Sequence, residues 1–161
     1  MDTKVKICGL TRPEDVAAAE HAGADFLGFI VEAESSRKLS IEDADALIQD
    51  VKTNTVAVTV DPDDRLIYKI LLAGFTHIQL HGNEGLSRTA QIAAQTDLKV
   101  IKAVPVATDD DVKLATEFSG AADLLLFDAK PPEQSDQRGG PRGGIGGWVF
   151  GRGPQTKTFI F

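Results

Sequence analysis

The 161-residue chain has room for one domain with a hydrophobic core and leaves none for a second domain of ordinary size. Its residues are 42% hydrophobic and 25% charged, and no apolar run approaches the roughly 20 residues that a membrane-spanning helix needs. The net charge of −7 argues against nucleic acid or an anionic membrane as a partner. A single cysteine excludes an internal disulfide, and residues 1–8 are too short and polar for a secretory signal, so we expect a cytoplasmic protein.

Six short apolar runs rich in β-branched residues alternate with segments of helical period, which predicts repeated strand and helix units. The runs are mostly continuous, as expected for parallel strands buried on both faces. The predicted strands cover Lys4–Cys8, Phe26–Ile30, Thr55–Val60, His77–Leu80, Lys99–Val104 and Asp123–Phe127.

Capping residues predict where the intervening helices begin and end. A hydroxyl or carboxylate side chain can accept from the free amide groups of a first helical turn, and such signals occur at Thr11 with Glu14, Ser40 with Asp43, Asp61 with Pro62, and Thr108 with Asp109–Asp111. A glycine can end a helix in a left-handed turn without steric cost, which predicts ends at Gly23, Gly74 and Gly120.

The alternation of strands and helices predicts an α/β fold with a parallel sheet. Strand starts recur every 20 to 30 residues, which fits either an open doubly wound sheet or an eight-stranded β/α barrel. The period alone does not choose between them. A complete barrel typically needs about 250 residues, so this chain is roughly two units short of one.

The composition changes abruptly after residue 136. Residues 137–161 contain no Asp, Glu, Ala or Leu, but hold eight of the 15 glycines together with four basic residues. Such a segment has neither helical period nor capping signals. We therefore divide the chain into residues 1–136, a partial β/α barrel, and residues 137–161, an irregular Gly/Arg-rich tail.

Two residues at predicted strand ends have the chemistry of an acid and base pair. Cys8 closes the first strand, at the sheet edge where α/β active sites lie, and a nearby helix N-terminus would favour its thiolate. Asp128 follows four large apolar residues, and desolvation there would favour the protonated acid. The alternatives are a small buried hydrophobic side chain for Cys8, and a cap or a salt bridge with Lys130 for Asp128.

Two further side chains follow other strands at the same edge. Arg37 could hold a carboxylate or phosphate in a bidentate manner, although a lone loop arginine is usually only solvated. His81 occupies the matching position after the fourth predicted strand, where a structural hydrogen bond is the alternative role. The three histidines lack metal-ligand spacing, and the tail glycines form no nucleotide-binding motif.

Five segments, in order and spacing, resemble phosphoribosylanthranilate isomerase of tryptophan biosynthesis. They are Lys4–Arg12 (KVKICGLTR), Gly23–Ile30 (GADFLGFI), Ser35–Arg37, Gln79–Gly82 (QLHG) and Phe127–Lys130 (FDAK). The resemblance implies an eight-stranded β/α barrel that needs no metal or cofactor and rearranges N-(5-phosphoribosyl)anthranilate to 1-(2-carboxyphenylamino)-1-deoxyribulose 5-phosphate. It implies Asp128 as the general acid, Cys8 as the base, and Arg37 and His81 as substrate-binding residues.

The quoted resemblance ends near Asp136, before the last two strand and helix units and the phosphate-binding loops of the family. Our hypothesis is a shifted reading frame or a truncated gene, which would leave the first and sixth strands as open apolar edges. The alternative function is a catalytically inactive barrel fragment that forms a homodimer through those edges. A third interpretation, another phosphosugar barrel such as an epimerase or an indole-forming synthase, would need metal-ligating histidines or a catalytic lysine, for which Lys6 and Lys102 are the candidates on strands.

Overall fold

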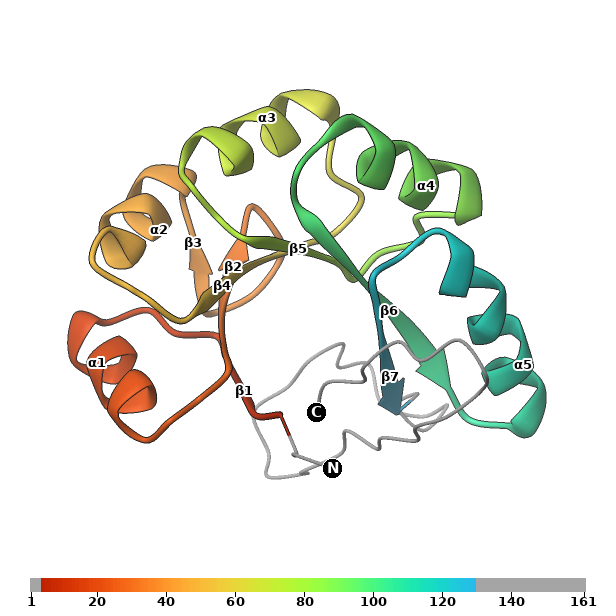
Figure 1. The fold of residues 1–161 in the computed structure, drawn as a ribbon, viewed down its shortest axis with the longest axis horizontal. Coiled ribbons are helices and arrows are strands. Elements are labelled where there is room, and N and C mark those ends of the chain that lie inside the picture. The colour runs from red at the N-terminus through yellow and green to blue at the C-terminus, as the bar shows by residue number, and fades with distance from the viewer. Residues whose placement is uncertain (1–3, 130–161) are drawn as a thin grey trace.

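The computed structural model describes residues 4–129, which form a curved parallel sheet with helices on its outer side (Figure 1). The strands are β1 (Lys6–Cys8), β2 (Phe26–Val31), β3 (Lys38–Leu39), β4 (Asn54–Thr59), β5 (His77–Leu80), β6 (Lys99–Val106) and β7 (Leu124–Ala129). The helices are α1 (Pro13–His21), α2 (Ile41–Ile48), α3 (Asp64–Leu72), α4 (Leu86–Gln95) and α5 (Asp109–Glu117), followed by a 3-10 turn, η1 (Phe118–Gly120).

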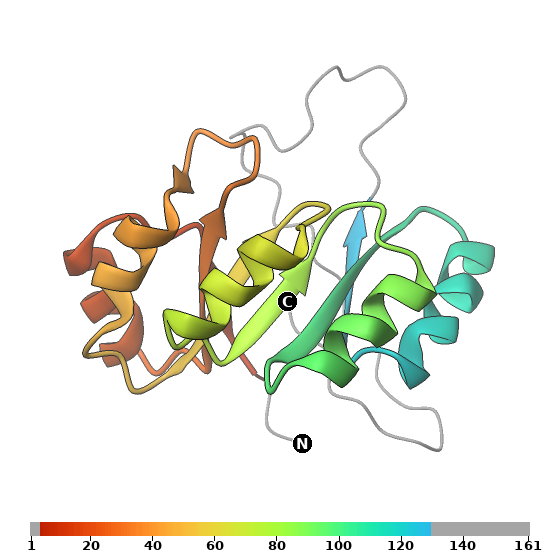
Figure 2. The ribbon, with the colours of Figure 1, turned by 90° about the horizontal axis from the view of Figure 1, so that it is seen from above.

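The strand order is β1-β2-β4-β5-β6-β7, with every pairing parallel. The six strands predicted from the sequence are therefore confirmed, with ends that shift by one or two residues. The short β3, which pairs with the end of β2, was not predicted because its Lys38–Leu39 pair carries no apolar run. In Figure 2 the main strands point the same way, so their carboxyl ends share one edge.

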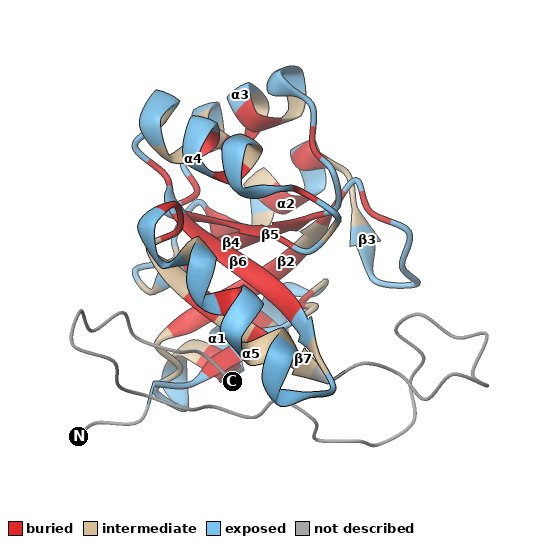
Figure 3. Ribbon diagram, turned by 90° about the vertical axis from the view of Figure 1, so that its right-hand side faces the viewer, coloured by how far each residue is buried: buried red, intermediate tan, exposed pale blue. Residues whose placement is uncertain are grey.

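Alternate residues of β2, β4, β6 and β7 enter two different cores. The outward residues pack against the helices in one large cluster that includes Leu27, Phe29, Ile78 and Val100. The inward residues form a smaller cluster of Phe26, Val56, Val58 and Ile101, packed against the partly buried Ile30, Leu124 and Leu126. Figure 3 shows burial concentrated on the strands and on the helix faces turned toward them. This layout is that of part of a β/α barrel, so the predicted fold class is confirmed for the described residues.

Two of the four predicted helix starts are confirmed by the hydrogen bonds that they make. The Ser40 hydroxyl accepts from the Asp43 amide at 3.0 Å at the start of α2. Thr108 forms a complete capping box with Asp111 at the start of α5. Each satisfies amide groups that the first turn would otherwise leave unpaired.

The other two predicted starts were wrong. Helix α1 begins at Pro13, and no side chain caps it, because its N-cap residue is Arg12, whose guanidinium has no acceptor atom. The Arg12 guanidinium pairs with Asp15 at 2.8 Å. This pair lowers the pKa of Asp15 by its hydrogen bond. Helix α3 is capped by Asp63, whose carboxylate accepts from the Leu66 amide at 2.7 Å.

Helical segments end next to or at all three predicted glycines, but only two of these glycines are in the left-handed conformation. Gly23 and Gly74 have φ values of 83° and 86°, the left-handed conformation that glycine adopts without a Cβ clash. Gly120 is the last residue of η1, which continues α5 by one tighter turn, and it is not among the glycines with positive φ. The predicted tail, residues 137–161, and Lys130 lie outside the described residues.

A buried ion pair fixes the loop between β5 and α4. Lys102 Nζ lies 2.8 Å from Glu84 Oε2, and the two side chains are 5% and 2% exposed. Lys102 also donates to the carbonyl oxygens of Leu80 and Gly82, while Glu84 accepts from the amides of Gly82 and Asp61. The Lys102 ammonium also lies 5.9 Å from the Phe118 ring centroid, on the helix side of the sheet. These bonds hold residues 80–84 against β6.

We expect Lys102→Met to lower the free energy of unfolding by about 3–5 kcal/mol, because it leaves the Glu84 carboxylate buried without its cation. Lys99→Met, on the same strand, is the matched control, since its ion pair with Asp123 is 63% and 38% exposed. The control should cost at most about 1 kcal/mol. Urea unfolding of both variants measures the difference, and equal costs would contradict the role of the buried pair.

A second prediction concerns His77, which is buried and packs edge-on against Phe26. Burial lowers the pKa of His77, the Lys99 charge acts in the same direction, and Asp123 opposes both. The folded state therefore binds the proton less well than the unfolded state does. The stabilisation is complete above the unfolded pKa of about 6.5 and is lost as the pH falls below it.

We therefore expect the free energy of unfolding to fall between about pH 7 and pH 5, and His77→Gln to flatten that part of the profile. Urea titrations at several pH values measure it. His21→Gln, at an exposed position at the end of α1, is the control and should leave the slope unchanged. An equal slope in wild type and His77→Gln would contradict the prediction.

Candidate functional site

The predicted site residues all lie at the carboxyl ends of parallel strands. Cys8 ends β1, Arg37 lies between β2 and β3, His81 directly follows β5, and Asp128 is the penultimate residue of β7. Since the strands run in one direction, these ends share one rim of the sheet, where β/α folds place their chemistry (Figure 2).

The Cys8 thiol is exposed and lies directly over Gly28 of β2. A Cβ at Gly28 would lie 2.9 Å from Cys8 Sγ and 3.0 Å from Lys6 Nζ, so only glycine leaves room for both. The thiol and the ammonium therefore lie close to each other on the inner face of the sheet. The single glycine inside an apolar strand was the signal in the sequence for this close approach.

Arg37 reaches back across the rim to β1. Its Nη1 donates to the Cys8 carbonyl oxygen at 3.1 Å. The guanidinium lies against Gly9, where Nη1 leaves no space for a Cβ, and Gly9 has a φ of 80°. The backbone amide of Arg37 donates to the Ser35 hydroxyl at 3.1 Å, which shapes the loop. The exposed guanidinium thus keeps donors available beside the thiol.

His81 links β5 to β7. Its Nε2 lies 3.1 Å from Asp128 Oδ2, and its Nδ1 lies 2.8 Å from Gln79 Nε2. The Asp128 side chain is 44% exposed, so the expected desolvation is only partial. Its partner among the described residues is His81, and the alternative salt bridge with Lys130 lies outside them.

The structure joins the predicted residues in two pairs. Arg37 contacts the backbone of Cys8 on one side, and His81 contacts Asp128 on the other. Within residues 4–129, no hydrogen bond or ion pair joins one pair to the other. Cys8 and Asp128 lie on the two outermost strands of the sheet, β1 and β7, at the two ends of the arc in Figure 1.

The sequence prediction did not include Gln79 and Glu84, and it offered Lys102 as a candidate catalytic lysine only for the alternative phosphosugar barrel. Lys102 is held on the helix side of the sheet by Glu84, so it is not at the inner rim. Gln79 lies inside the apolar run of β5, where a polar residue in a buried strand was the available signal. Residues 4–129 contain no group of three or more His, Cys, Asp or Glu side chains able to hold a metal ion.

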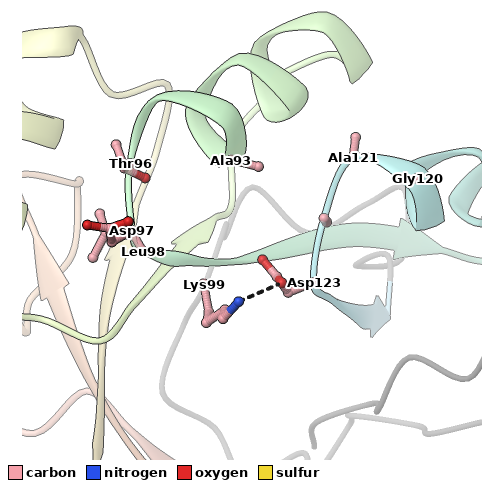
Figure 4. Close-up of a pocket in the computed structure, with 9 residues that line it drawn as sticks. Ala93, Thr96, Asp97, Leu98, Lys99, Gly120, Ala121 and Asp123 are labelled. Carbon is pink, nitrogen blue, oxygen red and sulfur yellow. Dashed lines mark hydrogen bonds and ion pairs between the residues drawn. The ribbon is translucent and has the colours of Figure 1, made fainter.

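A hollow of about 280 Å³ lies at the opposite end of the sheet, lined by the end of α4 and the starts of β6 and β7 (Figure 4). An ion pair between Lys99 and Asp123, 3.5 Å long, crosses it. The amino-terminal face of β/α folds usually serves stability, and none of the predicted site residues lines this hollow.

Comparison with known proteins finds relatives that match most of this chain. A relative from Caulobacter vibrioides, an N-(5'-phosphoribosyl)anthranilate isomerase, is 45% identical over 139 residues, 84% of this chain and 64% of the relative. One from Parvibaculum lavamentivorans is 41% identical over 166 residues, 99% of this chain and 77% of the relative. The chain thus spans about two thirds of the length of these relatives.

Solved structures give the same fold. Phosphoribosyl anthranilate isomerase from Thermotoga maritima superposes with a TM-score of 0.74 at 32% identity, over 82% of this chain and 64% of that one. A phosphoribosyl anthranilate isomerase in complex with reduced 1-(o-carboxyphenylamino)-1-deoxyribulose 5-phosphate gives a TM-score of 0.72 at 30% identity, over 80% of this chain and 66% of that one.

The family of N-(5'-phosphoribosyl)anthranilate (PRA) isomerases matches residues 5–147. This range contains nearly all of the quoted motifs and continues beyond Asp136, so part of the glycine-rich segment belongs to the match. The resemblance inferred from the sequence is confirmed, and the chain belongs to the N-(5'-phosphoribosyl)anthranilate isomerase family.

Proposed function

We propose that this chain carries the acid, the base and the carboxylate-binding group of an Amadori rearrangement that converts N-(5-phosphoribosyl)anthranilate to 1-(2-carboxyphenylamino)-1-deoxyribulose 5-phosphate. The observation that carries the proposal is the placement of the thiol, the guanidinium and the His81-bonded carboxyl on one rim. The relative solved with a reduced form of that product supports the same substrate class.

Asp128 would act first, as the general acid. Its proton moves to the furanose ring oxygen, the C1–O bond breaks, and the nitrogen lone pair forms the C=N bond of a Schiff base. The carboxylate that remains can accept from His81 Nε2, whose 3.1 Å contact is already in place. Partial exposure leaves the acid within reach of a substrate at the rim.

Cys8 would act second, as the general base. Its thiolate takes the proton from C2, and the electron pair forms the C1=C2 bond of an enolamine, which tautomerises to the ketone. The thiolate is the reactive form of a cysteine, and the Lys6 ammonium lies close to this thiol. Protons and electrons are redistributed within one substrate molecule, so the proposed reaction needs no cofactor or metal.

Arg37 and His81 would orient the substrate between these groups. The Arg37 guanidinium is exposed and suited to bidentate capture of the anthranilate carboxylate. Both ring nitrogens of His81 are engaged, so its influence on the substrate would pass through Asp128 and the edge of its ring. An accessible free thiol at the site also fits a reducing cytoplasmic location.

Loss of anthranilate fluorescence on freshly prepared substrate tests the proposal. We expect Cys8→Ala and Asp128→Asn each to lower kcat/KM by about 10²-fold to 10⁴-fold, because each removes a proton-transfer group. Asp110→Asn, on the exposed start of α5, is the control and should retain activity. Turnover by the wild-type chain no faster than by both variants would overturn the proposal.

A second candidate, self-association of a non-catalytic fragment, is favoured by the outer face of β1. Val5 and Ile7 are 45% and 40% exposed there, on an edge strand. An apolar edge of this kind offers unpaired backbone groups to another strand. A Thermotoga maritima relative is described as a dimeric enzyme from which monomers were generated, which fits the occurrence of dimers in the family.

No helix of residues 4–129 is long and apolar enough to cross a membrane.

We expect the chain to form a dimer through this edge and Ile7→Lys to shift it toward monomer, because a charge on an edge strand opposes strand pairing. Sedimentation at increasing concentration measures the mass. Leu72→Lys, at an exposed apolar position at the end of α3, is the matched control and should not change it. A concentration-independent monomer, or equal effects of the two variants, would contradict this candidate.

A further inference from the structure

Gln79 is a buried polar residue that the proposed mechanism does not use. It is 2% exposed, on the strand that leads to His81, and its Nε2 lies 2.8 Å from His81 Nδ1. Its Oε1 is buried and has no hydrogen-bond partner in the part of the chain that the structure describes. We propose that Gln79 is a positioning residue, whose amide holds His81 in the tautomer that donates from Nε2 to Asp128.

The donor and acceptor atoms of the two side chains determine the direction of this hydrogen bond. An amide nitrogen only donates, so His81 Nδ1 must accept and the ring proton must lie on Nε2. Turning the amide over would leave its nitrogen, with two N–H groups, as the buried group without a partner. Unpaired buried N–H groups are rarer than under-satisfied carbonyl oxygens, which favours the orientation observed.

His77, two residues before Gln79 on β5, provides an internal contrast. The Thr76 hydroxyl donates to the Thr55 carbonyl at 2.9 Å and lies 2.8 Å from His77 Nδ1. Since the single hydroxyl proton is already used, His77 Nδ1 must donate to the Thr76 oxygen. The two histidines of this strand are thus expected to be opposite tautomers when neutral.

The consequence for catalysis rests on the proposed function. A bond from His81 Nε2–H to Asp128 becomes stronger as the acid gives its proton to the substrate, because a carboxylate accepts more strongly than a neutral carboxyl group. An interaction that strengthens along the reaction lowers the barrier. Engagement of Oδ2 by His81 also leaves Oδ1 as the oxygen that faces the substrate.

Long-range ¹H–¹⁵N correlation spectra of the ¹⁵N-histidine-labelled chain, at about pH 8 where an ordinary histidine is neutral, test the proposal without any need for activity. The sequence has only three histidines, and His21→Gln and His81→Gln assign their signals. We expect His81 protonated on Nε2 and His77 protonated on Nδ1. Protonation of His81 on Nδ1 in the wild-type chain would overturn the proposal.

Two sets of variants test whether Gln79 causes this state. Gln79→Glu places a carboxylate against Nδ1, and His81 should then carry a proton there. Asp128→Ala should leave His81 on Nε2, whereas Asp128→Ala with Gln79→Met should move its signals toward those of free histidine. Gln91→Glu, on the exposed face of α4, should change nothing. An unchanged His81 pattern in both Gln79 variants would refute the role of Gln79.

The His77 pattern reports whether each variant is folded, since it depends on the Thr76 contact at the other end of β5. Should Gln79→Glu lose that pattern, the Gln79→Met comparison and the wild-type tautomer still decide. In the isomerase assay, Gln79→Met should lower kcat by about tenfold or more with little change in KM. A correct tautomer without turnover would refute the proposed function alone, whereas turnover with the opposite tautomer would refute the Gln79 proposal alone.

Discussion

The buried ion pair of Lys102 and Glu84 is the interaction on which the β5–β7 half of the site depends. The pair lies on the helix side of the sheet. There Lys102 donates to the carbonyl oxygens of Leu80 and Gly82, the residues on either side of His81. With its backbone fixed at both neighbours, His81 can direct its ring to the inner rim and reach Asp128. Two ionised groups that would be costly to bury separately thus form a rigid support for the exposed side chain of His81.

The two faces of the sheet have different roles: the outward face forms the large core, and the inward face carries the candidate site residues. Outward side chains pack against the helices and form the large core, so these positions are mostly apolar, apart from the Lys102 network and the buried Thr55 and Thr59 of β4. Inward side chains form only a small apolar cluster, which ends before the carboxyl rim. Cys8, Gln79 and Asp128 occupy inward positions of their strands. Side chains at these positions do not pack against the helices, so they need not be apolar.

The sequence predicted the six main strands because a continuous apolar run is a strong signal when both faces of a strand are buried. It predicted the caps at Ser40 and Thr108, where the capping hydroxyl and the third helical residue lie close in sequence and bond to each other. It failed at Thr11 and Asp61, whose alternatives lie nearby: Arg12 pairs with Asp15, and Asp61 accepts from the amide of Asn83. The roles of Gln79, Glu84 and Lys102 depend on partners from neighbouring strands and loops, which local spacing does not reveal. The motifs located Cys8, Arg37, His81 and Asp128, but not which of them touch.

Each half of the candidate site is internally fixed by short contacts. In the half formed by β1 and β2, Gly9 leaves room for the Arg37 guanidinium, and Gly28 leaves room for the thiol and the Lys6 ammonium. On β5 and β7, Gln79, His81 and Asp128 form one chain of hydrogen bonds. Between the halves lies β4, with its buried Val56 and Val58 on the inner face. The separation of base and acid is therefore set by the curvature of the sheet across β4, since Cys8 and Asp128 lie on opposite sides of that strand. A change in the volume of the inner cluster would move the two halves as units, and would affect the alignment of the two proton transfers before it disturbed either pair.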